Sequence, residues 1–269
     1  IFQENEGFTA TLPLGNDELY INKPMNSGPL SSFFPFISTD LTSDKGIMYG
    51  LNRHNSTLVI FDRFSLENAY TAIFAKSGAG KSYAAKLEIL RMLMTGTDVL
   101  VIDPENEYEM LANAVGGTIF KIGLHSKDHI NPLDIPPIPE DEVPGEFLKS
   151  HILNLTGLLK LMLGKITSEE DAILYQDLTE VYAARGIPAD RDFRNLEPPR
   201  LQEFRVVLEN MSGGRDLAQR LYKFTDGSFA GFVNQPTSVD VKNRFIVFSI
   251  RDLEEELRPV AMYIILNFV

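Results

Sequence analysis

The segment AKSGAGKS, residues 75–82, decides the fold class of this chain of 269 residues. It fits a phosphate-binding loop: Ala or Gly, any four residues, Gly, Lys, then Ser or Thr. The flanking sequence agrees with this reading. TAIFA (71–75) has the composition of a buried strand, residues 81–94 have the period of an amphipathic helix, and DVLVID (98–103) resembles a second strand. Gly96 is placed to cap the helix. We therefore expect an α/β core that binds nucleotide.

The parts of this loop have separable expected roles. Gly78 and Gly80 permit the backbone turns that bring successive N–H groups onto a β-phosphate, at the positive end of the helix dipole. Lys81 is expected to reach the β- and γ-phosphates, and the hydroxyl of Ser82 to ligate Mg²⁺. Tyr83 either stacks on a base or simply packs on the helix. The expected contacts to ATP are Ala75, Lys76, Ser77, Gly78, Ala79, Gly80, Lys81, Ser82 and Tyr83.

A group of carboxylates follows the second predicted strand, in the sequence VIDPENEYE. Asp103, Glu105 and Glu107 come at its carboxyl end, which faces the ligand crevice in parallel α/β sheets. Asp103 or Glu105 could orient the attacking water or contact Mg²⁺ through water, which would make them catalytic together with Lys81. The alternative is that Asp103 starts a turn and the glutamates lie in solvent. For Glu107 we favour the alternative.

A further acidic motif is expected of a P-loop ATPase, namely a hydrophobic strand that ends in Asp or Asp-Glu. None is visible between Gly80 and Val269. The chain begins with Ile1 rather than Met, and its last helical pattern stops abruptly, so we expect a fragment. Either the motif lies beyond Val269 or the site is degenerate.

Composition limits the other classes of function. The formal charge of −12 disfavours a surface that is coated uniformly by nucleic acid, although a local basic stripe in a ring pore remains compatible. The chain has no cysteine, which rules out disulfides and thiolate metal sites. It also has no signal peptide and no apolar run long enough to span a membrane. A cytoplasmic location, possibly peripheral at the inner face of the cell membrane, is expected.

The pattern of the sequence changes along the chain. Residues 1–70, which include TATLPLG and INKPMNSGP, read as short strands and hairpins that lead into the nucleotide-binding part. An α/β pattern covers residues 71–145 and ends in the proline-rich segment INPLDIPPIPEDEVPG (130–145). Residues 146–225 read as an all-α subdomain, with a capping box at Thr167 and Glu170. Residues 226–269 return to the α/β core with the strand RFIVFSI (244–250) and a helix from about Glu254.

Three other signatures carry less weight. MSGGR (211–215) is similar to the LSGGQ signature of ABC transporter ATPases, but the next strand does not end in Asp-Glu, so Gly213 and Gly214 are better explained as a helix terminator. His125 and His129 are four residues apart, but glycine and Asn-Pro flank them, which favours a loop over a metal site. The Asn-Lys-x-Asp element of small GTPases is missing.

Taken together, these residues closely resemble the C-terminal motor domain of the largest ATPase of type IV secretion and conjugation systems. That group is the TrbE/CagE type within the HerA/FtsK ring motors. The resemblance covers nearly the whole chain and rests on SFFPF, GIMYGLN, IFAKSGAGKSY, VLVIDPENEYEMLANAVGGT, HINPLDI, the helical insertion and FIVFSIRDL. It implies a RecA-like P-loop core with an inserted small all-α subdomain, and it implies phosphate binding by Gly78, Gly80, Lys81 and Ser82.

The resemblance also implies a function. Members of this group hydrolyse ATP with Mg²⁺, assemble as hexamers at the inner membrane, and power substrate transfer or pilus assembly with other secretion components. The group's Asp-Glu motif and arginine finger match no position here. Two alternatives stay open: a DNA-translocating ring ATPase of the HerA/FtsK kind, and a nucleotide-binding scaffold without turnover.

Overall fold

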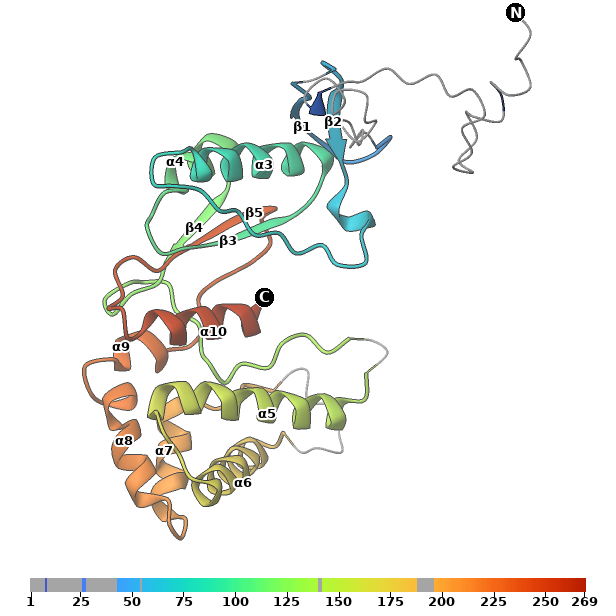
Figure 1. Cartoon of the computed structure of the whole chain (residues 1–269). Helices are drawn as coiled ribbons and strands as arrows, with labels where there is room; N and C mark the ends of the chain where they lie inside the picture. Colours follow the sequence, from blue (N-terminus) through green and yellow to red (C-terminus); the bar gives the residue numbers. More distant parts are fainter. Residues whose placement is uncertain (1–7, 9–25, 28–42, 54, 140–141, 188–195) are drawn as a thin grey trace, which may run out of the picture. The chain divides into compact units, whose positions relative to one another are not determined.

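The computed structural model describes residues 8, 26–27, 43–53, 55–139, 142–187 and 196–269. The chain divides into two compact units, Ile1–Tyr70 and Thr71–Val269 (Figure 1). Of the predicted β-rich segments, TATLPLG and all of INKPMNSGP except Asn26 and Ser27 lie outside the described residues, as does the motif SFFPF.

The described part of the first unit contains a β-hairpin. Strand β1 (Ile47–Leu51) pairs antiparallel with β2 (Leu58–Phe61), with a bulge between Met48 and Gly50. A short 3-10 turn, η2 (Arg63–Ser65), follows. The strand and hairpin character that the sequence indicates for residues 50–64 is present here.

The second unit contains a parallel sheet whose described strands run in the order β3-β5-β4. These are β3 (Val99–Asp103), β4 (Thr118–Lys121) and β5 (Phe245–Ser249). All five residues of β5 are buried, as expected for a central strand with a continuous apolar run. Helix α3 (Lys81–Thr95) precedes β3, and helix α4 (Glu109–Val115) connects β3 to β4. Gly96 ends α3 with φ 94° as predicted. Strand β4 is an element that the sequence reasoning missed.

The predicted buried strand at residues 71–75 is wrong. Residues 71–80 form an irregular, exposed segment, and the side chain of Phe74 is 92% exposed. Among the described strands, β3 pairs only with β5, so its other edge has no partner there. A β-forming composition produces a strand only where the backbone pairs with an edge and the side chains are covered. Residues 71–75 pair with no described strand, and their side chains are exposed.

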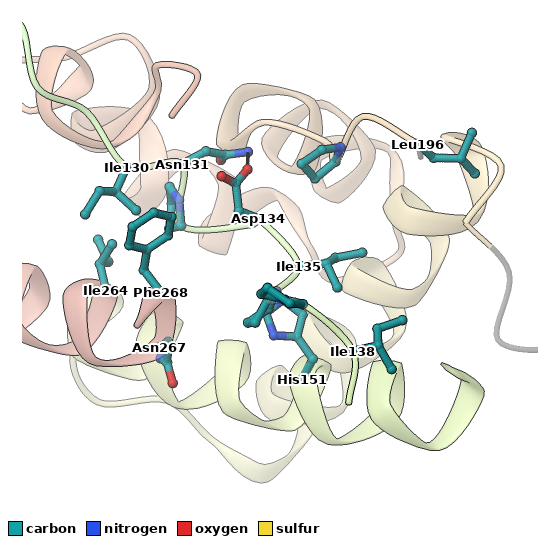
Figure 2. A pocket seen from close by; sticks show the side chains of 14 residues that line it. Ile130, Asn131, Asp134, Ile135, Ile138, His151, Leu196, Ile264, Asn267 and Phe268 are labelled. Carbon is teal, nitrogen blue, oxygen red and sulfur yellow. Dashed lines mark hydrogen bonds between the residues drawn. The ribbon is translucent and has the colours of Figure 1, made fainter. Parts of the chain in front are cut away.

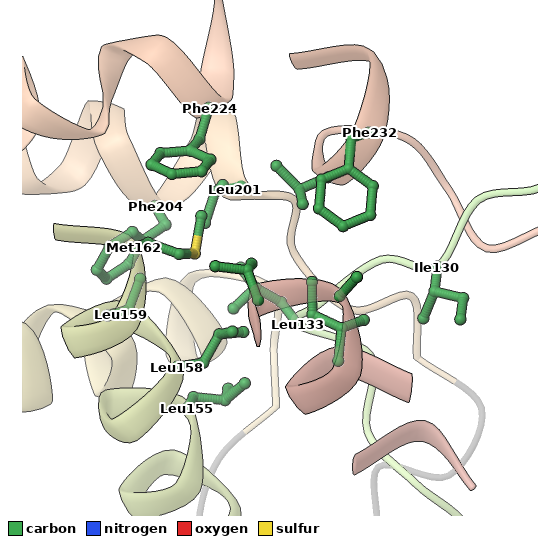
Figure 3. Close-up of a cluster of buried hydrophobic side chains, with 14 of the residues drawn as sticks. Ile130, Leu133, Leu155, Leu158, Leu159, Met162, Leu201, Phe204, Phe224 and Phe232 are labelled. Atoms are coloured by element: carbon green, nitrogen blue, oxygen red, sulfur yellow. The ribbon is translucent and has the colours of Figure 1, made fainter. Parts of the chain in front are cut away.

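A helical block occupies the middle of the chain and packs around a large apolar core. Its helices are α5 (Pro144–Leu163), α6 (Ser168–Ala184), α7 (Leu201–Asn210), α8 (Arg215–Thr225) and the short α9 (Ala230–Val233). The core includes Leu155, Leu158 and Met162 of α5, facing Phe204 and Phe224 of α7 and α8 (Figure 3). The linker predicted over 130–145 ends slightly earlier than expected, because α5 begins at Pro144.

The ends of these helices follow the sequence signals. Thr167 and Glu170 form the predicted capping box at the start of α6. The last helix, α10 (Arg258–Phe268), begins four residues later than the predicted Glu254. Turns occupy residues 251–257 instead, and Pro259 lies in the first turn of α10, where a missing N–H costs nothing.

Candidate functional site

The predicted phosphate-binding loop has the backbone geometry that its glycines allow. Gly78 has φ 76° and Gly80 has φ 89°, both in the left-handed region that favours glycine. The N–H of Ala79 donates to the carbonyl of Lys76 at 3.1 Å, which closes the turn of the loop. A β-carbon at Gly78 or Gly80 would meet no atom within 4 Å. Backbone conformation, rather than lack of space, is therefore what requires glycine at these two positions.

The N-terminus of α3 is open toward solvent. Its N-cap is Gly80, and no side chain in the described part of the chain caps it. By contrast, the N-terminus of α6 is capped by the hydroxyl of Thr167. The first N–H groups of a helix have no intrahelical partner, and together with the helix dipole they attract an anion. The loop and helix thus fit a phosphate group, with Lys81 and Ser82 in the exposed first turn.

The topology places this loop at the ligand side of the sheet. Helix α3 runs back along the sheet before β3 begins, so the loop before α3 lies on the side where the parallel strands β3 and β5 end (Figure 1). This is the side on which Asp103 and Glu105 follow β3. The sequence prediction that these elements share one edge is consistent with the fold.

Asp103 is buried and holds a turn together. Its Oδ1 accepts a hydrogen bond from the N–H of Glu105 at 3.2 Å, and its Oδ2 accepts one from the N–H of Tyr108 at 2.9 Å. Asn106, in the same turn, has φ 58°. Its side chain contacts Ser249 at the end of β5, where the Oγ and Oδ1 atoms are 3.3 Å apart. These contacts favour the turn-forming interpretation of Asp103 over a direct catalytic one.

Glu105 projects from this turn. Its side chain is 71% exposed, and its Oε1 lies 3.9 Å from Nη1 of Arg258 in the first turn of α10. Glu107 is also exposed, as predicted. The pKa of the neighbouring Tyr108 is raised, first by burial and then by the charges of Asp103 and Glu107. The turn therefore leaves Glu105 and Glu107 accessible, whereas Asp103 is buried.

Sequence reasoning missed Asn106, Ser249 and Arg258. Ser249 and Arg258 come more than 140 residues after Asn106, so only the parallel pairing of β3 with β5 brings them together. For Asn106 the sequence indicates a turn only weakly, because asparagine tolerates a positive φ better than most residues.

Comparison with known proteins agrees with this geometry. Residues 47–170 match the family model described as helicase HerA, central domain. The structure of VirB4 of Thermoanaerobacter pseudethanolicus superposes with a TM-score of 0.74 and 30% sequence identity, over 86% of this chain. These findings confirm the resemblance predicted from the sequence and the RecA-like α/β fold class.

This chain spans 64% of the length of that VirB4 chain. No curated protein matches the sequence of the chain significantly. Of the helices that the structure describes, none combines the length and the apolar character that a membrane span requires.

The weaker sequence signatures have structural explanations. Met211–Gly214 forms the turn between α7 and α8, with φ 83° at Gly213, as a helix terminator requires. A β-carbon at Gly214 would lie 2.1 Å from the carbonyl oxygen of Leu208. His125 and His129 lie in a loop, and no cluster of three metal-binding side chains occurs within the described ranges.

A cavity of about 620 Å³ lies away from the predicted nucleotide contacts. It is bounded by the proline-rich segment at 130–138, by His151 of α5, by residues 196–198 and by the end of α10 (Figure 2). None of residues 75–83, Asp103 or Glu105 lines it. The candidate site of this chain is therefore the open loop before α3, not this cavity.

Proposed function

We propose that this chain is an ATP-hydrolysing motor subunit of a type IV secretion or conjugation apparatus, which powers substrate transfer or pilus assembly. The observation that carries this proposal is the loop at residues 75–82, whose glycines hold positive φ angles before an uncapped helix, in a fold similar to that of VirB4. An uncapped helix N-terminus after a glycine-rich loop suits phosphate binding, and the similarity to VirB4 supports a motor function.

Each residue of the loop contributes to binding and to charge stabilisation. The N–H groups of the first turn of α3 would donate to the β-phosphate of ATP, and the ammonium of Lys81 would contact the β- and γ-phosphates. The hydroxyl of Ser82 would hold Mg²⁺, which neutralises phosphate charge when bound. Lys76, Ser77 and Ala79 supply backbone to the loop, Ala75 precedes it and Tyr83 flanks it.

A carboxylate is also needed to orient the attacking water. We assign this role to Glu105, because its side chain is exposed at the carboxyl end of β3. Asp103 would act indirectly, since both of its carboxylate oxygens accept hydrogen bonds from the turn that carries Glu105.

Phosphate release from Mg-ATP tests the proposal. The wild-type chain should release phosphate, Lys81→Ala should reduce the rate at least about tenfold through lost transition-state charge stabilisation, and Glu105→Gln should reduce turnover while nucleotide still binds. Lys149→Ala is the matched control, because Lys149 is an exposed lysine on α5. Equal turnover by Lys81→Ala and wild type would contradict the assignment. Binding without any phosphate release would instead support a nucleotide-binding scaffold.

The match to the central domain of helicase HerA favours a second candidate, a DNA-translocating ring ATPase. DNA-stimulated phosphate release that falls steeply with salt would support it, because contacts to DNA phosphates release counterions. The first proposal includes assembly as a homo-hexamer. It also includes docking on other secretion components at the inner face of the membrane. Sedimentation with and without Mg-ATP would reveal the assembly.

A further inference from the structure

Helix α10 has polar contacts with two different parts of the second unit. At its start, the guanidinium of Arg258 lies between the turns that follow β3 and β5. Nη1 is 3.9 Å from Oε1 of Glu105, while Nε is 3.4 Å from the carbonyl oxygen of Leu253. Nη2 is 3.5 Å from the carbonyl oxygen of Arg251. Arg258 thereby joins the ligand side of the sheet to the first turn of α10.

One and a half turns later, α10 contacts the helical block. The hydroxyl of Tyr263 donates a hydrogen bond to the backbone carbonyl of Asn154 in α5, at 2.8 Å. This approach depends on Gly157, because a β-carbon there would lie 2.6 Å from the Tyr263 hydroxyl oxygen. The buried residues Val260, Ala261, Ile264 and Ile265 anchor the rest of α10 in the core.

The two contacts are joined by a single short stretch of helix. Tyr263 comes five positions after Arg258 in the helix, which is about 7.5 Å of helical rise. Helical hydrogen bonds make such a stretch rigid, so a displacement at its first turn is carried to the contact with α5. The contact between Glu105 and Arg258 is, by contrast, too long for a hydrogen bond. Of the contacts made by α10, the one between Glu105 and Arg258 should therefore change most readily.

We propose that α10 transmits the nucleotide state of the candidate site to the helical block. Arg258 is a positioning residue for Glu105, and the Tyr263–Asn154 contact is the output. This inference rests on the proposed function. Without nucleotide, Arg258 attracts Glu105. When Mg-ATP is bound, Glu105 turns toward the phosphate-binding loop, and Arg258 retains only the carbonyl oxygens of Arg251 and Leu253. The first turn of α10 then shifts, and α5 responds through Tyr263.

Amide hydrogen exchange of the whole chain, with and without the non-hydrolysable probe adenylyl imidodiphosphate and Mg²⁺, tests this coupling. In the wild type, we expect the probe to protect residues 76–84 and to change exchange in α5 around residues 150–160 by about threefold or more. Arg258→Gln should keep the protection of the loop and lose the response in α5. Arg258→Lys, which retains the charge, should restore part of the response. Tyr263→Phe should keep the response of α10 and weaken that of α5.

The matched control is Arg251→Gln, which removes a positive charge from the exposed turn next to Arg258. It should behave as wild type. A wild-type chain whose loop is protected while α5 does not respond would overturn the coupling but leave the proposed function intact. An unchanged response in Arg258→Gln would also overturn it. No protection at residues 76–84 would overturn the proposed function and the coupling with it.

Discussion

Asp177 of α6 is a charged residue type in a fully buried position. Its side chain is 0% exposed, and neither carboxylate oxygen has a hydrogen-bond partner among the residues that the structure describes. Burial, with a smaller contribution from the charge of Glu180, raises its pKa from 3.8 to about 8. The folded protein therefore holds a proton at neutral pH that the unfolded chain releases.

This difference predicts how stability depends on pH. Between the unfolded pKa of 3.8 and the folded value of about 8, the contribution of Asp177 to the free energy of unfolding should fall as pH rises. Asp177→Asn should abolish this slope and raise the free energy of unfolding at pH 7.5 by on the order of 1–3 kcal/mol. Urea titrations from pH 5 to pH 8 would measure it. Glu169→Gln, an exposed acid on the same helix, should leave the slope unchanged.

His151 of α5 should contribute a slope of the opposite sign to the free energy of unfolding below pH 6.5. Burial lowers its pKa from 6.5 to about 4. The hydroxyl of Tyr182 donates to the carbonyl of Leu133 at 2.7 Å, so Nε2 of His151, 3.3 Å away, is the donor to Tyr182. Since the unfolded chain binds a proton first, the contribution of His151 to stability should decline as pH falls from 6.5 toward 4, against the contribution of Asp177.

The variant His151→Gln tests this acid-side decline. It keeps a donor for Tyr182 but cannot titrate, so urea titrations at pH 6.5 and pH 4.5 should show a smaller loss of stability than in the wild type. A loss equal to that of the wild type would show that other groups cause the decline.

At the scale of elements, Gly80 and Gly116 form a natural pair for testing the loop. Gly80 precedes α3 with φ 89°, and Gly116 follows α4 with φ 73°. A β-carbon at either position would have no other atom within 4 Å. Alanine at either position should therefore cost about 1–2 kcal/mol of stability, the strain of the left-handed conformation. Only Gly80→Ala should also weaken binding of Mg-ATP, because only Gly80 shapes the phosphate-binding loop.

Thermal unfolding and calorimetric titration with Mg-ATP would separate these two effects. Equal losses of nucleotide affinity in both variants would mean that general destabilisation, and not loop geometry, controls binding.

Elements with strong local signals were predictable from the sequence. The period of residues 81–94, the glycine after it and the capping box at Thr167 act within a few residues, and the structure has all three. Residues 71–75 show the limit of this reasoning. Their composition favours a strand, but strand formation depends on a neighbouring edge, which no local pattern reports. Strand β4 was missed because it has only four residues, too few to give a clear pattern in the sequence.

At the scale of the whole molecule, the phosphate-binding half of the site was predictable and the carboxylate half only partly. The loop is one contiguous segment, so its sequence motif alone predicts its backbone conformation. The surroundings of Glu105 are assembled from β3, β5 and α10, and β5 joins the sheet only after the entire helical block. Sequence distance therefore hid Ser249 and Arg258, and the sequence leaves the roles of Asp103 and Glu105 open.

The measurement that tests the central claim most directly is a titration of the isotopically labelled chain with Mg-ADP, followed through its backbone amide resonances. We expect the largest shifts at residues 76–83, because the N–H groups of that loop would bind the β-phosphate, and we expect Lys81→Ala to suppress them while Lys149→Ala does not. Shifts confined to the cavity beside His151, or no shifts at millimolar nucleotide, would contradict the assignment of residues 75–82 as a nucleotide site.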